Sequence, residues 1–251
     1  MTRITQVGAG AGIAAFVFVV ATALPGEALA QGVSIDLGEG GSVTATSLQL
    51  IALITLLSLA PGIAIMVTCF PFLVTVLSIL RQAIGLQQSP PNMLIVSLAL
   101  FLTYFVMEPT FSAAWENGLQ PMLEEQIDAE EAIPRTLAPF RVFMAGRTDP
   151  KTFGAMADLR PDAAGATLDP DADLSVLIPS FMLSEISRAF QVGFLIFLPF
   201  LIIDLVVAAV LMSMGMMMVP PAIVSLPFKL AFFVIADGWS LIAGALVRSY
   251  F

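Results

Sequence analysis

The sequence predicts an all-α membrane protein with about four long, partly kinked helices in two hairpins. Of its 251 residues, 58% are hydrophobic and only 12% are charged, whereas charged residues make up roughly 25% of an ordinary soluble domain. The hydrophobic residues form runs as long as the roughly 20 residues that cross a bilayer. The charged residues are concentrated in one stretch between these runs, which predicts a water-facing insertion of short helices and loop.

The first thirty residues have the features of a cleaved signal peptide. Arg3 lies in a short n-region, an apolar stretch follows at residues 13–24, and an A-x-A cleavage pattern ends at Ala30. We therefore expect the mature chain to begin at Gln31, with a short extracytoplasmic segment over residues 31–47. The alternative is a first transmembrane helix, but the apolar stretch is short and is followed by Pro-Gly-Glu.

The first helical hairpin is predicted over residues 48–107, where the only charged residue is Arg81. Its first apolar run is longer than one crossing requires. That run contains Pro61-Gly62 and Pro71, and proline can kink a helix by removing a backbone hydrogen bond. We therefore expect a bent or broken helix. The polar sequence from Arg81 to Pro91 predicts the turn of the hairpin.

Residues 108–175 are predicted to form the acidic, extracytoplasmic domain. From Glu108 to Asp173 the chain carries 13 acidic and five basic residues, a net charge of −8. Residues 115–144 have apolar side chains at helix-like spacing, punctuated by prolines, which predicts short helices. Residues 148–173 are rich in Ala, Asp, Pro and Gly and lack an apolar period, which predicts a flexible loop.

Residues 176–251 are predicted to form the second helical region. The apolar run that begins at Leu174 is expected to be interrupted at Pro199 and to stop at Pro220-Pro221, because proline cannot continue the hydrogen-bond ladder. Residues 223–247 form the last apolar stretch. If the signal peptide is cleaved, the turn at Arg81 is cytoplasmic and the acidic domain lies on the opposite, extracytoplasmic side of the membrane.

Three charged residues of the second region need compensation, because charge in hydrocarbon is costly and usually faces protein or water. Glu185 and Arg188 are three residues apart, close enough to pair on one helix face, and Asp204 lies alone further along. The pattern is compatible with a self-satisfied pair near the interface, a proton or ion relay, or a polar contact with another subunit.

Five methionines fall within residues 212–218, around Gly215 and just before Pro220-Pro221. Three rotatable bonds allow methionine to fill irregular and changing gaps. A ring of such side chains could close around a moving polypeptide and deform to let it pass. The simpler interpretation is that they are ordinary hydrophobic residues of a hydrophobic helix.

Several functional classes are excluded or disfavoured by composition. The chain has no His and one Cys, which excludes a His-dependent triad, a His-ligated metal site and an internal disulfide. A net charge of −9 makes it a poor ligand for nucleic acid. It has no Walker motif and no nucleophile elbow, and Asp204 and Asp237 lack the paired context of an intramembrane protease. We expect no enzymatic activity, no metal and no cofactor, and a packing role for Cys69.

Three long strings carry a family resemblance. They are VLSILRQAIGLQQSPPNMLIVSLALFLTYFVMEP at residues 76–109, IPSFMLSEISRAFQVGF at 178–194 and LPFLIIDLVVAAVLMSMGMMMVP at 198–220. Together they resemble the FliP family, the integral-membrane export-gate component of bacterial flagella, which has the SctR proteins of virulence-type secretion as relatives. The resemblance runs from about Ser47 to the end and is more specific than any single motif.

The resemblance implies a core subunit of the flagellar type III export gate in the inner membrane, at the flagellar basal body. It implies a homo-oligomeric ring with FliQ-like and FliR-like partners, through which unfolded flagellar polypeptides pass. The methionine loop that closes the channel in the family would be Met216, Met217 and Met218 here. The signal peptide favours the flagellar branch over the virulence-type branch.

The alternative function is a proton-coupled small-solute transporter subunit that uses Glu185, Arg188 and Asp204. Four helices are few for a self-contained carrier, and transporters usually have repeated halves. Two stretches also depart from the family pattern. Phe72 stands where the family commonly has an intramembrane Arg, and residues 153–173 match poorly, which suggests a lineage-specific insertion.

Overall fold

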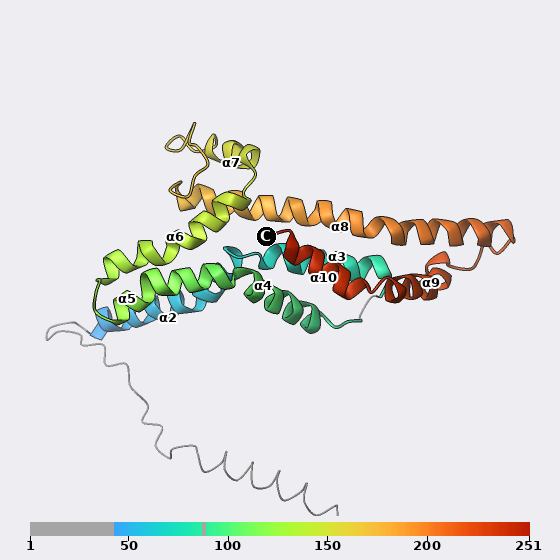
Figure 1. The fold of residues 1–251 in the computed structure, drawn as a ribbon, viewed down its shortest axis with the longest axis horizontal. Helices are drawn as coiled ribbons and strands as arrows, with labels where there is room; N and C mark the ends of the chain where they lie inside the picture. The colour runs from blue at the N-terminus through green and yellow to red at the C-terminus, as the bar shows by residue number, and fades with distance from the viewer. Residues whose placement is uncertain (1–42, 87–88) are drawn as a thin grey trace, which may run out of the picture. The chain divides into compact units, whose positions relative to one another are not determined.

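The computed structural model describes residues 43–86 and 89–251, which form helices and no strand (Figure 1). The all-α prediction is confirmed for this part of the chain, whereas the predicted signal peptide lies outside it. The contacts divide the chain into two units, Met1–Thr55 and Leu56–Phe251. In chain order the helices are α2 (Val43–Met66), α3 (Phe70–Ile84), α4 (Asn92–Ala114), the π-helix η1 (Trp115–Leu119), α5 (Gln120–Leu123), α6 (Ala129–Arg147), α7 (Pro150–Ala157), α8 (Leu174–Ser213), α9 (Pro221–Ile235) and α10 (Gly238–Arg248).

The first apolar run is broken, as its length and prolines predict, but at one place only. α2 continues through Pro61-Gly62 and ends at Met66, and α3 begins at Phe70. Pro71 lies in the first turn of α3, where the missing N–H leaves no helical hydrogen bond unmade. Between the helices, the hydroxyl of Thr68 accepts a hydrogen bond from the backbone N–H of Phe70 at 3.4 Å.

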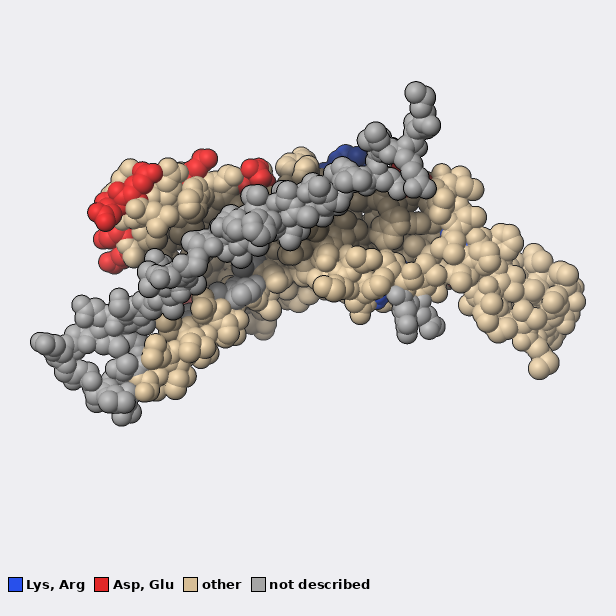
Figure 2. All heavy atoms as spheres, turned by 90° about the horizontal axis from the view of Figure 1, so that it is seen from below, with Lys and Arg blue, Asp and Glu red and all other residues tan. Residues whose placement is uncertain are grey.

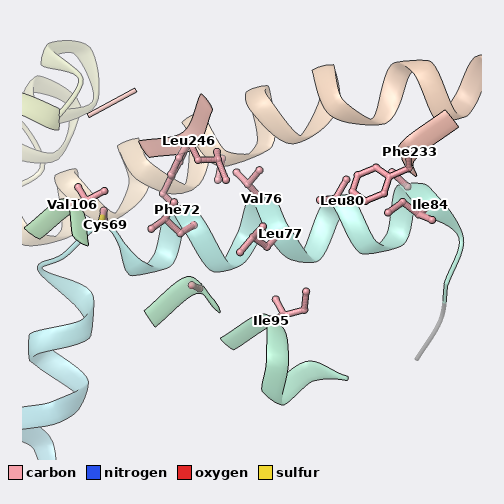
Figure 3. Close-up of a cluster of buried hydrophobic side chains, with 14 of the residues drawn as sticks. Cys69, Phe72, Val76, Leu77, Leu80, Ile84, Ile95, Val106, Phe233 and Leu246 are labelled. Atoms are coloured by element: carbon pink, nitrogen blue, oxygen red, sulfur yellow. The ribbon is translucent and has the colours of Figure 1, made fainter. Parts of the chain in front are cut away.

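α3 is the centre of the hydrophobic core of the second unit. It packs most extensively on α8 and also contacts α4 and α9. Figure 3 shows its buried side chains directed towards the neighbouring helices. On α8, Gly193 permits close approach, because a Cβ at this position would lie 2.5 Å from Cδ1 of Ile79. The buried residues of α3 are Phe72, Leu73, Val76, Leu77, Leu80, Ala83 and Ile84.

The connection from α3 to α4 is shorter than the sequence suggested. Arg81 belongs to the last turn of α3 and not to the turn itself. Gly85 ends the helix in the left-handed conformation, with a φ of 90°. The guanidinium of Arg81 donates hydrogen bonds to the carbonyl of Pro90 and to the side chain of Asn92. Because α3 contacts α8 more extensively than α4, the predicted arrangement in two hairpins is not confirmed.

The acidic insertion contains a longer helix than predicted. α6 covers 19 residues and continues through Pro134 and Pro139, so the prediction of short helices separated by these prolines is wrong there. Contacts of α6 with α4, η1 and α8 compensate for the hydrogen bonds that the prolines cannot donate. Figure 2 shows the acidic side chains gathered at the end of the unit where this insertion lies.

The predicted flexible loop at residues 148–173 is wrong over its first part, which forms α7. Asp149 caps this helix by accepting a hydrogen bond from the N–H of Thr152 at 3.0 Å, and Pro150 occupies its first turn. Phe153 and Ala157 are buried in a second core cluster with residues of α8. Two buried side chains are too few to produce a recognisable apolar periodicity. The sequence therefore did not predict this helix.

α8 is one helix of 40 residues, so the predicted interruption at Pro199 is wrong. Phe200 next to it is buried and packs against two phenylalanine rings of α9. Packing therefore continues across the proline and compensates for its missing hydrogen bond. The predicted break between the two helices is present but begins earlier than expected, since α8 ends at Ser213, before the methionines at residues 214–218, and α9 begins at Pro221.

The last apolar stretch forms two helices and not one. α9 and α10 are bent by 61° at the break between them. Asp237 adopts the left-handed conformation with a φ of 47°. Gly238 is required at this bend, because a Cβ there would lie 2.2 Å from the ring of Phe233.

Among the described residues, two helical stretches are long and apolar enough to cross a membrane by themselves, Asn92–Leu123 and Leu174–Ser213. The bent pair α9 and α10 supplies a third if it acts as one span. α3 has 15 residues, fewer than the roughly 20 that a crossing requires. The prediction of four long helices is therefore met only in part.

Candidate functional site

The methionine loop, residues 214–220, connects α8 to α9. Gly215 ends α8 with a φ of 76°, and the N–H of Met216 donates a hydrogen bond of 3.0 Å to a carbonyl in the last turn of the helix. From here the exposed fraction rises, from 43% at Met216 to 83% at Met217 and 98% at Met218. The loop thus presents a flexible, apolar tip that the described part of the chain leaves uncovered.

An apolar cavity of about 550 Å³ adjoins the methionine loop, between the end of α8 and α9. Met214 and Met216 belong both to the loop and to the lining of the cavity, so a movement of the loop changes the shape of the cavity. The lining has no charged side chain and includes Val207, Leu211, Val224 and Phe228.

A first polar cluster surrounds Glu185, whose side chain is fully buried on α8. Arg147 of α6 approaches one carboxylate oxygen at 3.2 Å, and Arg188 approaches the same oxygen at 3.5 Å. The hydroxyl of Tyr250 donates a hydrogen bond to the other oxygen. Glu185 and Arg188 therefore pair as their spacing predicts, but the shorter ionic contact comes from a distant part of the sequence. We call these four residues the Glu185 cluster.

A second polar cluster surrounds Asp204, nearer to the methionine loop. The Nζ atom of Lys229 lies 2.6 Å from the carboxylate, and the hydroxyl of Ser225 donates a hydrogen bond to it. Lys229 also donates to the carbonyl of Ala83, 3.1 Å away in the last turn of α3, where the helix dipole favours a cation. This Asp204 cluster therefore ties α8 and α9 to the end of α3.

The three charged residues singled out from the sequence do not form one site. Glu185 and Asp204 are 19 positions apart on a continuous helix, about 28 Å at 1.5 Å per residue. Each carboxylate has its own cations within 4 Å. The arrangement consists of two separate structural clusters and gives no support to a relay that passes through all three residues.

The sequence analysis did not assign four members of the two clusters. The four residues differ in whether the sequence contained a pattern that could have identified them. Arg147 lies in the charged insertion, where a cation is expected to face water. Tyr250 lies outside the apolar runs. For Lys229 a signal existed, because one Lys and one Asp in otherwise apolar helices predict each other as partners. Ser225 has a short polar side chain of the kind that commonly bonds its own helix, so it gave no signal.

Phe72 and Cys69 both contribute packing at the start of α3. Phe72 is fully buried and meets the ring of Tyr250 edge-on, with 5.6 Å between ring centroids. It supplies no charge, and the cations beside Glu185 are Arg147 and Arg188. Cys69 is a free, fully buried thiol in the same core. Within the described ranges, no group of three or more His, Cys, Asp or Glu is placed to hold a metal ion.

Comparisons with known proteins connect this architecture to one family. The FliP family matches residues 53–246, which include the methionine loop and most of both clusters. A flagellar biosynthetic protein FliP from Caulobacter vibrioides is 51% identical over 90% of this chain and 85% of its own length. One from Agrobacterium fabrum is 49% identical over 92% of this chain and 96% of its own. One from Aquifex aeolicus is 45% identical over 87% and 91%, respectively.

Proposed function

This chain belongs to the FliP family, and we propose that it is a core subunit of the flagellar type III protein export gate. The observation that carries the proposal is the similarity to proteins named flagellar biosynthetic protein FliP, at 49–51% identity over at least 90% of the chain. The role is non-enzymatic, since a gate subunit contributes a passage and its closure. Its substrates are unfolded flagellar polypeptides.

We propose that several copies form a ring together with FliQ-like and FliR-like membrane proteins, in the inner membrane at the flagellar basal body. The apolar surface supports this assembly. In the apolar segment of α8 that could cross a membrane, only 11% of the residues are buried by the rest of the chain. Large exposed apolar surfaces mark contacts with protein or membrane, so α8 needs cover from lipid or from neighbouring subunits.

We infer that Met216, Met217 and Met218 close the channel. Their exposure at the tip of the loop supports this role, since side chains from several copies can meet there. Methionine is apolar and flexible, so such a ring excludes water at rest and deforms when a polypeptide passes. The Asp204 cluster holds the base of the loop, because it joins α8 and α9 at Asp204, 14 residues before Met218, and at Lys229, 11 residues after it.

We also propose that the acidic insertion, residues 108–175, faces the periplasm and that the signal peptide is cleaved after Ala30. The net charge of −8 between Glu108 and Asp173 supports a water-facing position. N-terminal sequencing of the membrane-purified protein tests the cleavage, with Gln31 expected as the first residue. Intact Met1 in most of the material would contradict it and would remove the basis for the topology.

The proton-coupled transporter is not supported as an alternative. Its three proposed residues lie in two clusters that are separated along α8 and neutralised locally. The relatives described above are named for flagellar biosynthesis and not for solute transport.

The test of the gate replaces Met216, Met217 and Met218 with Ala together. The change removes most of the apolar volume at the tip, so we expect the pore to leak ions while the complex still assembles. Ion permeability of cells that produce the variant with its partner proteins is measured beside motility. The matched control replaces the same residues with Leu, which keeps volume and apolarity and should seal. If the Ala variant assembles and leaks no more than the unaltered protein, the gate assignment fails.

A further inference from the structure

Tyr250 connects helices that are distant in the sequence. Figure 1 shows the marked end of the chain close to α6, α8 and α3. The ring of Tyr250 stacks on Phe143 of α6, with centroids 6.1 Å apart and 15° between the planes, and meets Phe72 of α3 edge-on. Its hydroxyl donates a hydrogen bond to Glu185 of α8. One side chain therefore contacts three helices.

Arg147 makes further contacts with Tyr250 and with its neighbour Ser249. Its guanidinium lies over the ring of Tyr250, 4.0 Å from the centroid, and donates a 3.0 Å hydrogen bond to the carbonyl of Ser249. Its Nε atom lies 3.2 Å from Glu185. The planar guanidinium can bond a carbonyl and a carboxylate while it stacks on an aromatic ring, a combination unavailable to Lys.

Glu185 makes this docking necessary. Its side chain has no exposure to solvent, and a buried carboxylate requires cations and hydrogen-bond donors to offset its lost hydration. Its partner on the same helix, Arg188, is itself 36% exposed and more distant. Arg147 and Tyr250 therefore supply the enclosed part of the compensation.

Besides the Ser249–Tyr250 segment, α10 is attached near its two ends: Trp239 meets the ring of Phe233 of α9 edge-on, and Leu246 is buried in the α3 core. The helix makes few contacts with α4 and α9. An apolar groove of about 380 Å³ runs between α8 and α10 and is lined by Phe72, Val192, Leu246 and Ser249, among others. The helix is thus not packed tightly against α8, and the segment that follows it adds to the anchorage that Leu246 provides at this end of the helix.

We propose that Ser249–Tyr250 is a conformational latch that holds α10 against α6 and α8. α10 joins α9 through the 61° bend, and α9 begins directly after the methionine loop. The methionine loop lies at the start of the pair formed by α9 and α10, and the docked latch lies at the end of this pair. The latch therefore fixes the end of the pair that is opposite to the loop. Its release loosens the end of α10 where Leu246 packs in the α3 core. The latch is independent of the proposed export function, because it rests on contacts within one chain.

Cys69 provides a reporter for the latch. It is the only cysteine in the chain, it is fully buried, and it lies one turn before Phe72 in the same core (Figure 3). Labelling by a maleimide reports opening of the core around this thiol, and that core includes Phe72, which the ring of Tyr250 contacts. The experiment measures the labelling rate of the full-length protein in its detergent-extracted complex.

Tyr250→Phe removes the hydroxyl and keeps the ring. Loss of a hydrogen bond to a buried charge shifts an equilibrium by about tenfold or more, so we expect Cys69 to be labelled about tenfold faster. Tyr250→Ala should label faster still. Phe251→Ala is the matched control, since Phe251 is the adjacent residue and is 78% exposed, and its rate should stay unchanged.

Two results would overturn the latch. In the first, the Tyr250→Phe protein assembles as the unaltered chain does, and Cys69 is labelled at an unchanged rate. The other is equal acceleration by Phe251→Ala, which would indicate general fraying at this end. If Tyr250→Ala does not assemble, the Tyr250→Phe result decides. Neither outcome depends on export, so failure of the latch and failure of the proposed function are distinguished.

Discussion

The two polar clusters occupy different parts of α8 and differ in how completely the fold encloses them. The carboxylate of Glu185 is fully buried, and its partners come from α6, from α8 itself and from the segment after α10. The carboxylate of Asp204 is 32% exposed, and its partners come from α9. Beyond Asp204 the helix leads to the methionine loop, whose tip is almost fully exposed.

This difference suggests that α8 has a fixed part and an adjustable part. A fully enclosed charge with several partners tolerates one arrangement, because breaking one pair leaves an uncompensated charge. A partly solvent-exposed ion pair beside flexible methionine side chains tolerates several arrangements. Under the proposed function, the helix is anchored at the acidic insertion and remains able to yield where polypeptides pass.

The largest expected effect tests the fixed part. Glu185→Ala leaves Arg147, whose side chain is only 15% exposed, beside Tyr250 without its carboxylate. Breaking such a buried pair costs about 3–5 kcal/mol in the free energy of unfolding. We expect the complex to fail to assemble or to melt at a clearly lower temperature. The measurements are the size of the detergent-extracted complex and its thermal unfolding.

Glu131→Ala is the control for this substitution. Glu131 pairs with Arg135 on the surface of α6, where both side chains are about half exposed, so the pair is screened by water and contributes less than about 1 kcal/mol. Its removal should leave assembly unchanged. Equal behaviour of the two Ala variants, both assembled and motile, would show that enclosure at Glu185 has no energetic consequence.

The second effect tests the adjustable part. Asp204→Ala leaves Lys229 buried with one carbonyl acceptor, and we expect a loss of about 2–3 kcal/mol, smaller than at Glu185 because Asp204 is partly solvated. Asp204→Leu combined with Lys229→Met removes both charges and should recover most of the loss. Thermal unfolding of the three proteins measures this, and a double variant as unstable as Asp204→Ala would contradict the ion-pair explanation.

The sequence alone was informative wherever local chemistry decides the structure. The apolar runs predicted helices, the Pro220-Pro221 pair predicted a break between α8 and α9, and the three-residue spacing predicted contact between Glu185 and Arg188. Each of these depends on neighbouring residues only. The family resemblance, and not the methionine run by itself, placed Met216, Met217 and Met218 in the loop that joins α8 and α9. The role of this loop as a gate stays a prediction.

The sequence was uninformative where packing between segments that are distant in the sequence determines the structure. Pro199 does not interrupt α8 because Phe200 packs on α9, and Phe153 orders α7 by burial in a second core. Arg147 was missed because a cation in a charged region looks solvated, although it is folded against Tyr250. These contacts join residues tens of positions apart, so no local pattern contains them.

The third effect concerns the point between the two clusters where α8 meets α3. Gly193→Ala places a Cβ 2.5 Å from Cδ1 of Ile79, and because this methyl group can shift, we expect a net loss of only about 1 kcal/mol. Gly154→Ala on α7 is the control, since nothing lies within 4 Å of the added Cβ and a helical Ala gains up to about 1 kcal/mol. Thermal unfolding should move in opposite directions, and a stabilised Gly193→Ala protein would contradict the close contact.

The smallest expected effect lies at the tip of the methionine loop. Met217→Leu keeps a similar volume and apolarity on a side chain that is 83% exposed in the single chain, so we expect the free energy of unfolding to change by less than about 0.5 kcal/mol. Leucine lacks the thioether flexibility, however, and a stiffer side chain adapts less well to a passing polypeptide. The variant should therefore seal the membrane against ions and assemble normally while it secretes flagellar proteins more slowly. Secretion rate is measured beside ion permeability and melting temperature. A loss of stability comparable to that of Asp204→Ala would show that the loop is a rigid packing element, and the distinction between the two parts of α8 would disappear.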